Sequence, residues 1–297
     1  MKYGKLEDIS GVNFSLPEDH PHTHRALDGE PCQTDFRLGG TMWNVPAWVG
    51  SWYPLRTPSS QFLFHFSRMF SAIELNATHY RIPTVETVKA WVDQVPPNFM
   101  FCPKFPQGIS HYRRFQNCDQ QTDEFLKALL AFGHHLGPSF IQLPPNFSIK
   151  SAHALLDYLR ELPRDLHVAI EFRHPEWFAA TREALEVWET LHELQITAVL
   201  SDTAGRRDAV HMHLTSPHFI LRYGGNGMDV TDHSRLAVWA QRATEWSSRG
   251  LRSFHLWMHQ PDSLVSPESC ILFADELERF SGRTIERPQR RAADLFG

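Results

Sequence analysis

The chain has 297 residues, of which 42% are hydrophobic and 21% are charged, and its net charge is −5 with histidine neutral. This composition is typical of a globular protein with a large core, and the excess of acidic residues argues against bulk binding to nucleic acid or to an anionic membrane. The four cysteines are widely spaced and form no CxxC pair, which disfavours a disulfide framework and favours a cytoplasmic location. No run reaches the roughly 20 apolar residues that span a bilayer, so no membrane association is expected.

Residues 1–36 are polar and irregular in pattern, and they contain the alternating histidines His20, His22 and His24. We expect an N-terminal extension that folds over one end of the main domain, which then comprises residues 37–297. The three histidines are compatible with a metal site, although alternating histidines in a loop are more often solvated. The sequence leaves both interpretations open.

From residue 37 onward, apolar strand-like runs alternate with segments that have apolar residues at helical spacing. Eight strands are expected at residues 37–43, 72–78, 99–104, 139–143, 166–172, 196–201, 219–223 and 253–258. Strands that alternate with helices form parallel βα units, and eight such units close into a barrel. The sequence therefore predicts an α/β fold, a single (β/α)8 domain of the TIM-barrel type.

Several of these strands are polar at every second residue, although parallel strands are usually apolar on both faces. If the apolar residues face the helices, the polar residues line the inside of the barrel. This interior set comprises Glu74, Asn76, Lys104, Gln142, Glu171, Arg173, Asp202, Arg222, His255 and His259. Buried charges need partners or water, and most of these residues stand at strand ends. We therefore expect a polar pocket at the C-terminal mouth of the barrel.

Motifs at the same strand ends resemble those of a known family. They are the segments Ile73–Pro83, Phe101–Lys104 with Ile109–His111, Gln142–Pro145, Glu171–Trp177 and Ser201–Thr203. Over roughly residues 37–280 the chain resembles the YecE-like family of uncharacterised TIM-barrel proteins, domain of unknown function seventy-two. The resemblance implies a TIM barrel and brings no settled activity. The chain departs from the family pattern at Gly39–Trp43 and at Trp257–Asp262, where a shared ligand would be affected.

The first functional hypothesis is an enzyme of the hydrolase, isomerase or lyase type. It would act on a small polar substrate, sugar-like or phosphorylated, by acid/base chemistry at the barrel mouth. The expected catalytic residues are Glu171, Lys104 and Asp202. Burial raises the pKa of a carboxyl group such as Glu171 towards the working range, whereas nearby carboxylates would raise the pKa of Lys104 and so disfavour a Schiff-base role for it. The expected substrate-binding residues are Glu74, Asn76, Tyr80, Gln142, Arg173, His174, Arg222 and Trp43.

Two kinds of ligand are considered for this mouth. The glycine-rich segment Arg222–Gly227 is typical of phosphate binding by backbone amides; the alternative is a flexible turn, with Arg222 paired to Glu171 or Asp202. Glu74, Glu171, Asp202 and His259 offer ligands for a divalent metal, but neutralisation by nearby basic residues is the alternative. No motif for an organic cofactor is present.

The second functional hypothesis is a non-catalytic protein that binds a nucleotide or nucleic acid in the same pocket. The aromatic loop with Trp43, Trp48, Trp52 and Tyr53 would then stack on a base or a sugar, unless it packs against the barrel. A purely structural protein is a third hypothesis. The sequence does not determine the oligomeric state.

Overall fold

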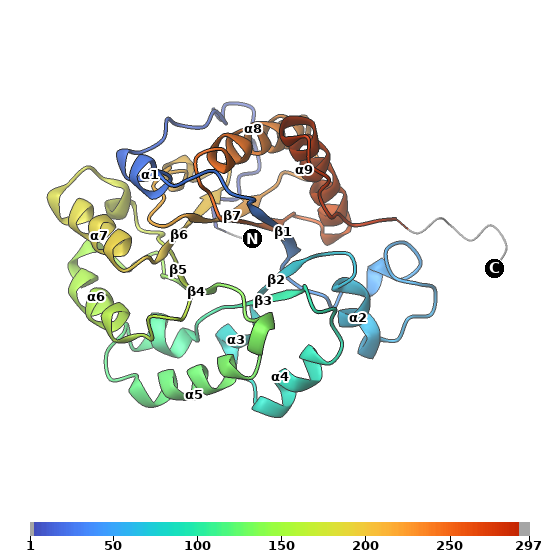
Figure 1. Ribbon diagram of the computed structural model, residues 1–297, viewed down its shortest axis with the longest axis horizontal. Coiled ribbons are helices and arrows are strands. Elements are labelled where there is room, and N and C mark those ends of the chain that lie inside the picture. The colour runs from blue at the N-terminus through green and yellow to red at the C-terminus, as the bar shows by residue number, and fades with distance from the viewer. Residues whose placement is uncertain (1–2, 291–297) are drawn as a thin grey trace.

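The computed structural model describes residues 3–290, in which a ring of helices surrounds parallel strands (Figure 1). The strands are β1 Asp35–Gly40, β2 Ala72–Leu75, β3 Met100–Pro103, β4 Ser139–Gln142, β5 Val168–Glu171, β6 Thr197–Asp202, β7 His218–Gly224 and β8 Ser253–His259. The helices are α1 Pro21–Ala26, α2 Phe62–Phe66, α3 Ala77–Tyr80, α4 Val85–Val92, α5 Asp119–Leu130, α6 Ala152–Glu161, α7 Arg182–Glu193, α8 Val230–Ser247 and α9 Ser266–Ser281. None of the helices in this part of the chain is both long and apolar enough to cross a bilayer.

The eight strands form one sheet that is nearly closed into a barrel. Neighbouring strands pair in the order β3-β2-β1-β8-β7-β6-β5-β4. The two outer strands, β3 and β4, meet through isolated bridges that join Phe101 to Leu136 and Lys104 to Phe140. The predicted α/β fold of the TIM-barrel type is therefore confirmed.

The alternation of side chains along each strand explains how the barrel is filled. Outward-facing residues such as Ile73, Ile170 and Leu221 belong to the large apolar core under the helices. Inward-facing residues form a second apolar cluster: Ala72, Cys102, Phe140, Ala169, Val199, Ile220 and Trp257. Residues two positions further along the same strands, including Glu74 and Lys104, share the inward face and lie closer to the C-terminal ends. The barrel is therefore packed in its middle and polar at its mouth.

Most strand boundaries differ from the predictions by a few residues, and strand two is an example. Strand two was expected to reach residue 78, but β2 ends at Leu75 and α3 follows at Ala77; the Thr78 hydroxyl donates to the carbonyls of Leu75 and Lys104. After β5 the chain forms a 3-10 turn at 175–178 before α7 begins at Arg182. Thr181 begins α7 because its hydroxyl accepts the amide proton of Ala184.

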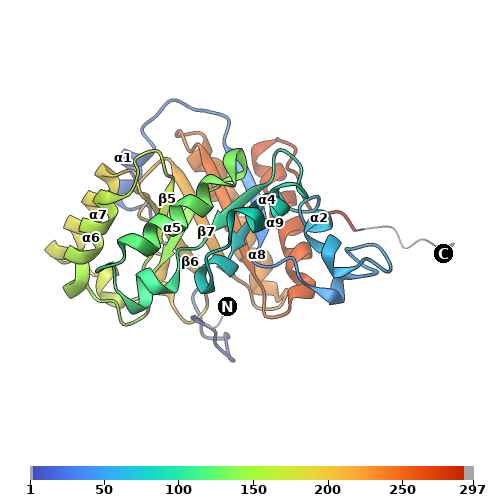
Figure 2. The same cartoon turned by 90° about the horizontal axis from the view of Figure 1, so that it is seen from below.

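The N-terminal segment is more ordered than expected, since it contains α1, and β1 already begins at Asp35. It lies along the β6–β7 connection, in which a 3-10 turn at 207–209 takes the place of an α-helix. The Asp19 carboxylate accepts from Trp246 of α8 at 3.0 Å, and the Thr23 hydroxyl donates to the Met212 carbonyl at 2.5 Å. Figure 2 shows the start of the chain and α1 at opposite ends of the barrel. The segment thus covers one side of the barrel as well as an end.

Candidate functional site at the barrel mouth

The guanidinium of Arg222 lies at the centre of the mouth, between two carboxylates. Its Nε and Nη2 donate to the two oxygens of Glu74 at 3.0 and 2.8 Å, and its Nη1 donates to both oxygens of Glu171 at 2.9 and 2.8 Å. The carboxylate side chains are 0% exposed and that of Arg222 is 3% exposed. A guanidinium suits this position because its planar set of donors matches carboxylates. The three residues tie together β2, β5 and β7, which are not neighbours in the sheet.

Each carboxylate has further hydrogen-bond partners. The Nε2 of His259 lies 2.7 Å from Glu74, and the Nδ2 of Asn76 donates to Glu74 at 2.9 Å. The Ser201 hydroxyl donates to Glu171 at 2.7 Å. The buried charges are therefore satisfied on all sides, as burial requires.

Both carboxyl groups stay ionised despite their burial. Burial alone would raise the pKa of Glu171, but Arg173 and Arg222 outweigh it and hold that pKa at about 2. Burial likewise opposes ionisation of Glu74, and Arg222 with His259 keeps its pKa well below the usual value. The expectation that burial tunes Glu171 into a general acid or base near neutral pH is wrong, because the neighbouring cations dominate.

Lys104 stands next to this network and is only 6% exposed. Its Nζ donates to the Oε1 of Gln142 at 2.9 Å, and the same oxygen accepts from Arg173 at 2.8 Å. Burial, followed by the charge of Arg222, lowers the pKa of Lys104 to about 8 and outweighs the two carboxylates. The sequence argument expected a raised pKa. It was wrong because Arg222 already neutralises the carboxylates and the lysine itself is desolvated.

Two histidines flank Lys104 on the same side of the mouth. Burial and the charge of Lys104 lower the pKa of His79 and that of His111 to about 4, so both rings are neutral near pH 7. The Nδ1 of His79 lies 2.7 Å from the Phe105 carbonyl. His111 comes from a helical turn at 108–112, and its ring meets that of His79 edge-on at 4.9 Å. This side of the site therefore combines the amine of Lys104, whose pKa is near neutrality, with the two neutral imidazoles of His79 and His111.

Asp202 does not belong to the mouth. Ser201 points into the barrel, so the next residue along β6 points outward. The Asp202 carboxylate accepts from Trp239 Nε1 at 2.7 Å and pairs with Arg235 at 2.9 Å, both of α8, and it also pairs with Arg207. The placement of Asp202 inside the barrel is therefore wrong, and its partners identify it as an anchor between β6 and α8.

The glycine-rich segment after β7 does not offer its amides to a phosphate. The amides of Asn226 and Met228 donate to the Asp232 carboxylate at 2.8 and 2.9 Å, and the amide of Gly227 donates to the Gln260 side chain at 2.9 Å. An internal carboxylate in the first turn of α8 thus occupies the position that an anion would take. The phosphate-loop interpretation of this segment is contradicted.

The aromatic loop packs against the protein. Trp48, Trp52 and Tyr53 are 2%, 4% and 1% exposed, and Trp43 meets Trp91 of α4 edge-on at 5.7 Å. Because these rings already have packing partners, the structure favours the packing interpretation over ligand stacking.

Two further expected binding residues lie around the rim. Tyr80 is 73% exposed at the end of α3. The Nδ1 of His174 accepts the Glu176 amide proton at 3.3 Å and so fixes the turn that follows Arg173. Tyr80 is therefore open to a ligand, whereas one ring nitrogen of His174 already serves the backbone.

The four proposed metal ligands do not converge on one point. The guanidinium of Arg222 separates Glu74 and His259 from Glu171, and Asp202 faces α8. A cation between the two carboxylates would have to displace Arg222 and its four hydrogen bonds. The alternative considered for these residues, neutralisation by basic side chains, matches the geometry.

The mouth opens into a cavity of about 670 Å3, a size suited to a small ligand. Its walls come from residues 3–9 on one side and from the loops after β6, β7 and β8 on the other, and His259 connects it to the ion-pair network. The ring of Tyr3 lies 4.4 Å from the Arg173 guanidinium carbon. The N-terminal segment therefore covers part of the mouth.

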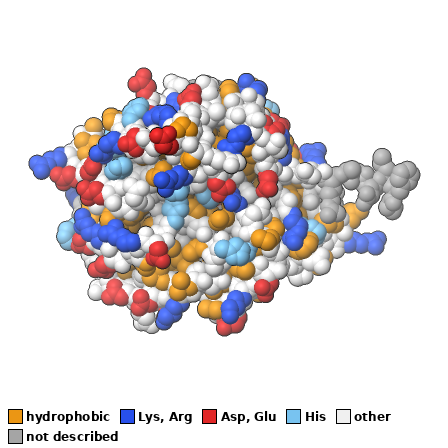
Figure 3. Space-filling view, in the orientation of Figure 1, with side chains coloured by type: hydrophobic (Ala, Val, Ile, Leu, Met, Phe, Trp, Pro, Cys, Tyr) orange, Lys and Arg blue, Asp and Glu red, His pale blue; other side chains and the backbone are white. Residues whose placement is uncertain are grey.

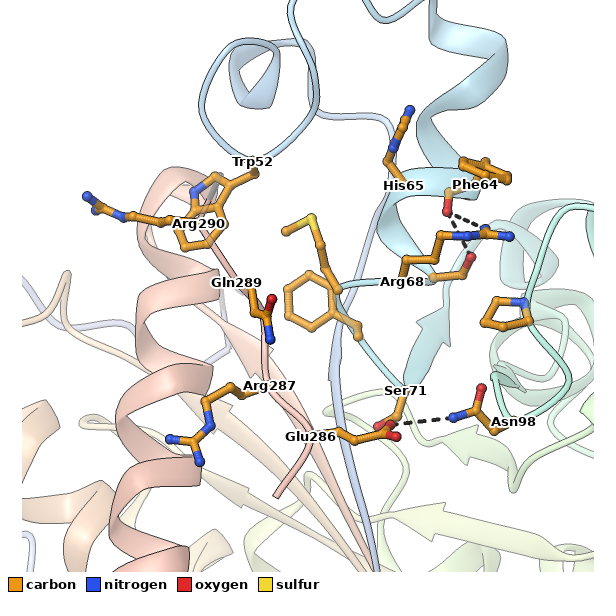
Figure 4. Close-up of a pocket in the computed structure, with 14 residues that line it drawn as sticks. Trp52, Phe64, His65, Arg68, Ser71, Asn98, Glu286, Arg287, Gln289 and Arg290 are labelled. Atoms are coloured by element: carbon orange, nitrogen blue, oxygen red, sulfur yellow. Dashed lines mark hydrogen bonds between the residues drawn. The ribbon is translucent and has the colours of Figure 1, made fainter. Parts of the chain in front are cut away.

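A second cavity of about 680 Å3 lies between α2 and residues 286–290 (Figure 4). Ser71 and Asn98 in its wall precede β2 and β3, so it lies at the opposite end of the strands from the polar mouth. Its arginines are engaged elsewhere: Arg68 donates to backbone carbonyls, and Arg287 pairs with Asp275. The barrel mouth is therefore the stronger candidate.

Several residues of the mouth had no role in the sequence argument. Ser201 was missed because the neighbouring Asp202 was assigned to the inward face of strand six, and Tyr3 because no local pattern links it to the barrel. His79 and His111 lie inside the motifs that resemble the YecE-like family, and this was the signal that could have found them.

The fold and the mouth together define a TIM-barrel protein with a buried ion-pair network at the C-terminal ends of its strands. Residues 37–293 match the family described as "Protein of unknown function DUF72", and the chain belongs to this family.

Relatives and solved structures agree with this assignment. The chain is 31% identical over 250 residues to UPF0759 protein YecE of Escherichia coli K12, which covers 78% of this chain and 88% of YecE. It is also 31% identical over 134 residues to UPF0759 protein YunF of Bacillus subtilis 168, and this match covers 43% of this chain and 48% of YunF. A crystal structure of a DUF72 family protein from Enterococcus faecalis V583 matches with a TM-score of 0.61 at 16% identity, covering 85% of this chain and 99% of that one. The structural match supports the fold alone.

Proposed function

We propose that the protein is an enzyme that acts on a small, polar, anionic substrate at the barrel mouth, with Lys104 as the group that transfers a proton. The observation that carries the proposal is a buried lysine of lowered pKa beside fixed guanidinium groups. Perturbed titratable groups are characteristic of active sites, and the cavity at the mouth reaches this network at His259, while Lys104 lies behind its wall. The barrel fold by itself supports no particular reaction.

The pKa of Lys104 suits acid/base chemistry. With a pKa of about 8, about a fifth of the side chain is neutral at pH 7.4, so one residue can both accept and donate a proton. Glu171, with a pKa of about 2, stays ionised and cannot act as a general acid. Its role in this proposal is to hold Arg173 and Arg222 in place.

The charge of the mouth favours an anion. Lys104, Arg173 and Arg222 carry three positive charges, and Glu74 and Glu171 carry two negative charges, so 3 − 2 leaves one positive charge in excess. Arg222 pairs with both carboxylates and Arg173 pairs with Glu171, so the excess lies with Lys104, whose Nζ donates to the neutral Gln142 side chain. A phosphorylated sugar or a sugar acid would supply the oxyanion. The exposed ring of Tyr80 is available to stack on its apolar face.

The surface charge gives less support to a nucleic-acid ligand. On the face shown in Figure 3, the described acidic and basic side chains are interspersed. A nucleic-acid site usually presents a basic patch or stripe.

The proposal is tested by melting temperature against sugar phosphates, sugar acids, nucleotides and neutral sugars. A ligand at about a hundred times its dissociation constant raises stability by about 2.7 kcal/mol. We expect anionic sugars to stabilise the protein and Lys104→Gln to abolish turnover of the compound that binds. Lys150→Gln, on an exposed lysine in the loop before α6, is the matched control. Binding without turnover under any condition would favour a non-catalytic binding protein, and stabilisation by neutral sugars alone would contradict the charge argument.

A further inference from the structure

A histidine cluster lies outside the barrel mouth, where the N-terminal segment meets the β6–β7 connection. Its members are His20 and His22 from the start of α1 and His213 from the connection. One ring nitrogen from each residue can be chosen so that all three lie within 4.8 Å of one another. The family match begins at residue 37, so two of the three histidines lie outside it.

We propose that His20, His22 and His213 form a binding site for Zn2+ that fastens the N-terminal segment to the barrel. Imidazole nitrogen is a preferred zinc ligand, whereas Mg2+ and Ca2+ require oxygen. Three histidines leave the fourth tetrahedral position to water. The site is independent of the function proposed for the mouth.

The nitrogens are already close enough for a zinc site, although the stacked rings must rotate before their in-plane lone pairs converge on one ion. Zinc–nitrogen bonds of about 2.0–2.1 Å in a tetrahedron place the nitrogens about 3.3 Å apart. The rings of His20 and His213 are stacked with centroids 3.4 Å apart and an interplanar angle of 15°, so their edges already have a similar spacing. The ring of His22 meets that of His20 edge-on at 4.7 Å.

Two ring nitrogens in the cluster are buried without a hydrogen-bond partner in the described part of the chain. They are the Nδ1 atoms of His22 and His213. A buried polar atom without a partner is costly, and a bound cation would satisfy both atoms at once. The Nδ1 of His20 accepts the His22 amide proton at 3.3 Å, so His20 would offer its Nε2 to the metal and give up this weak cap of α1.

The surroundings orient the ligands as metal sites usually do. The Nε2 of His22 lies 3.6 Å from the Glu189 carboxylate, which is held by Arg25 through two hydrogen bonds of 3.2 and 2.5 Å. At 3.6 Å this contact is too long for a hydrogen bond; once it shortens, a carboxylate behind a histidine fixes the ring and leaves the other nitrogen for the metal.

His211 fixes the turn that carries His213. Its Nδ1 accepts the His213 amide proton at 3.1 Å, and its Nε2 lies 3.4 Å from the Val199 carbonyl. Met212 between them has a φ of +52°, a conformation that non-glycine residues seldom adopt. Because both of its nitrogens are engaged, His211 supports the turn and is not a ligand.

His24 provides a matched control on the same helix. Its Nδ1 lies 2.9 Å from Arg249, so its side chain belongs to a different contact. The proposal therefore predicts that two of the three alternating histidines in the segment bind the metal and one does not.

The test uses the full-length protein without an affinity tag, stripped with a chelator and titrated with Zn2+ against a chromophoric chelator. We expect one Zn2+ per chain. His22→Gln and His213→Gln should weaken affinity by roughly a hundred-fold or more and Glu189→Gln by roughly ten-fold, with His24→Gln unchanged. X-ray absorption of the wild-type complex should show three imidazole ligands, which decides the matter even if a variant fails to fold. Zinc should also protect residues 4–20 from protease. Absence of stoichiometric uptake, a zinc spectrum without imidazole, or equal losses in His24→Gln and His22→Gln would overturn the proposal.

Discussion

Replacement of Arg222 by methionine tests the claim that the mouth is held together by one guanidinium. The substitution removes four hydrogen bonds of 2.8–3.0 Å and leaves Glu74 and Glu171 buried at 0% exposure. Removal of one partner from a buried ion pair costs about 3–5 kcal/mol. Glu171 keeps Arg173 and Ser201, whereas Glu74 keeps only His259 and Asn76 among its hydrogen-bond partners in the described chain. We therefore expect a loss of about 3–5 kcal/mol at pH 7, with Glu74 the main source.

The loss of stability caused by Arg222→Met should become smaller as the pH falls. In the wild type the pKa of Glu171 is about 2 and that of Glu74 is well below normal, so their stabilising contributions persist from pH 7 down to the unfolded-state pKa of about 4.3. Without Arg222, burial raises the pKa of Glu74 above its unfolded value. The folded variant then binds a proton more readily than the unfolded chain, and its stability increases as the pH falls from 7 towards 4.3. The difference between variant and wild type should shrink over this range.

Urea denaturation at pH 7 and pH 5, monitored by tryptophan fluorescence, measures both effects. Arg182→Met is the control, because that arginine forms an exposed pair with Glu186 and should give no measurable change. A loss below about 1 kcal/mol for Arg222→Met, or a larger loss at pH 5 than at pH 7, would refute the reasoning.

Two further substitutions test the neighbouring charges. Lys104→Met should raise the free energy of unfolding by about 1–3 kcal/mol at pH 7, because a folded pKa of about 8 lies below the unfolded value of about 10.4. This gain should shrink as the pH rises from 8 through the unfolded pKa of about 10.4, above which the wild-type lysine is neutral in both states. A gain at pH 10.5 as large as at pH 7 would show that the charge of the lysine does not destabilise the folded protein. Asp202→Asn should cost about 1–3 kcal/mol, since Arg235 loses one of its two buried carboxylate partners and keeps Asp232, while ligand binding at the mouth stays unchanged. If Asp202→Asn weakened ligand binding at the mouth without lowering the free energy of unfolding, Asp202 would belong to the functional site after all.

Most of the fold could be predicted from the sequence because strands and helices are identified from patterns of neighbouring residues. Apolar runs, helical spacing and caps identify strands and helices one at a time, and the alternation of polar residues placed Glu74, Lys104, Glu171 and Arg222 inside the barrel. Asp202 was misplaced because the inward phase of one short strand was assigned from its charge rather than from its neighbours. A shift of one residue reverses the face of every side chain in a strand.

The functional assignments depended on distances that a sequence does not contain. Whether Glu171 behaves as an acid or as a permanent anion depends on two guanidinium groups brought to it from β5 and β7. Because the same ion pairs neutralise the carboxylates, desolvation is the largest effect on Lys104 and lowers its pKa. The sequence argument had expected nearby carboxylates to raise that pKa. Electrostatic effects of this kind follow position and burial, not residue type.

The sequence by itself therefore determined the barrel, its polar mouth and the family to which the chain belongs, since each follows from periodicity or from contiguous motifs. Only the tertiary structure decided which charges neutralise one another, that Asp232 occupies the glycine-rich loop, and that His213 joins His20 and His22 across almost 200 residues of chain. These are contacts between segments far apart in sequence. Their existence depends on how the strands and loops pack, and no local pattern encodes that arrangement.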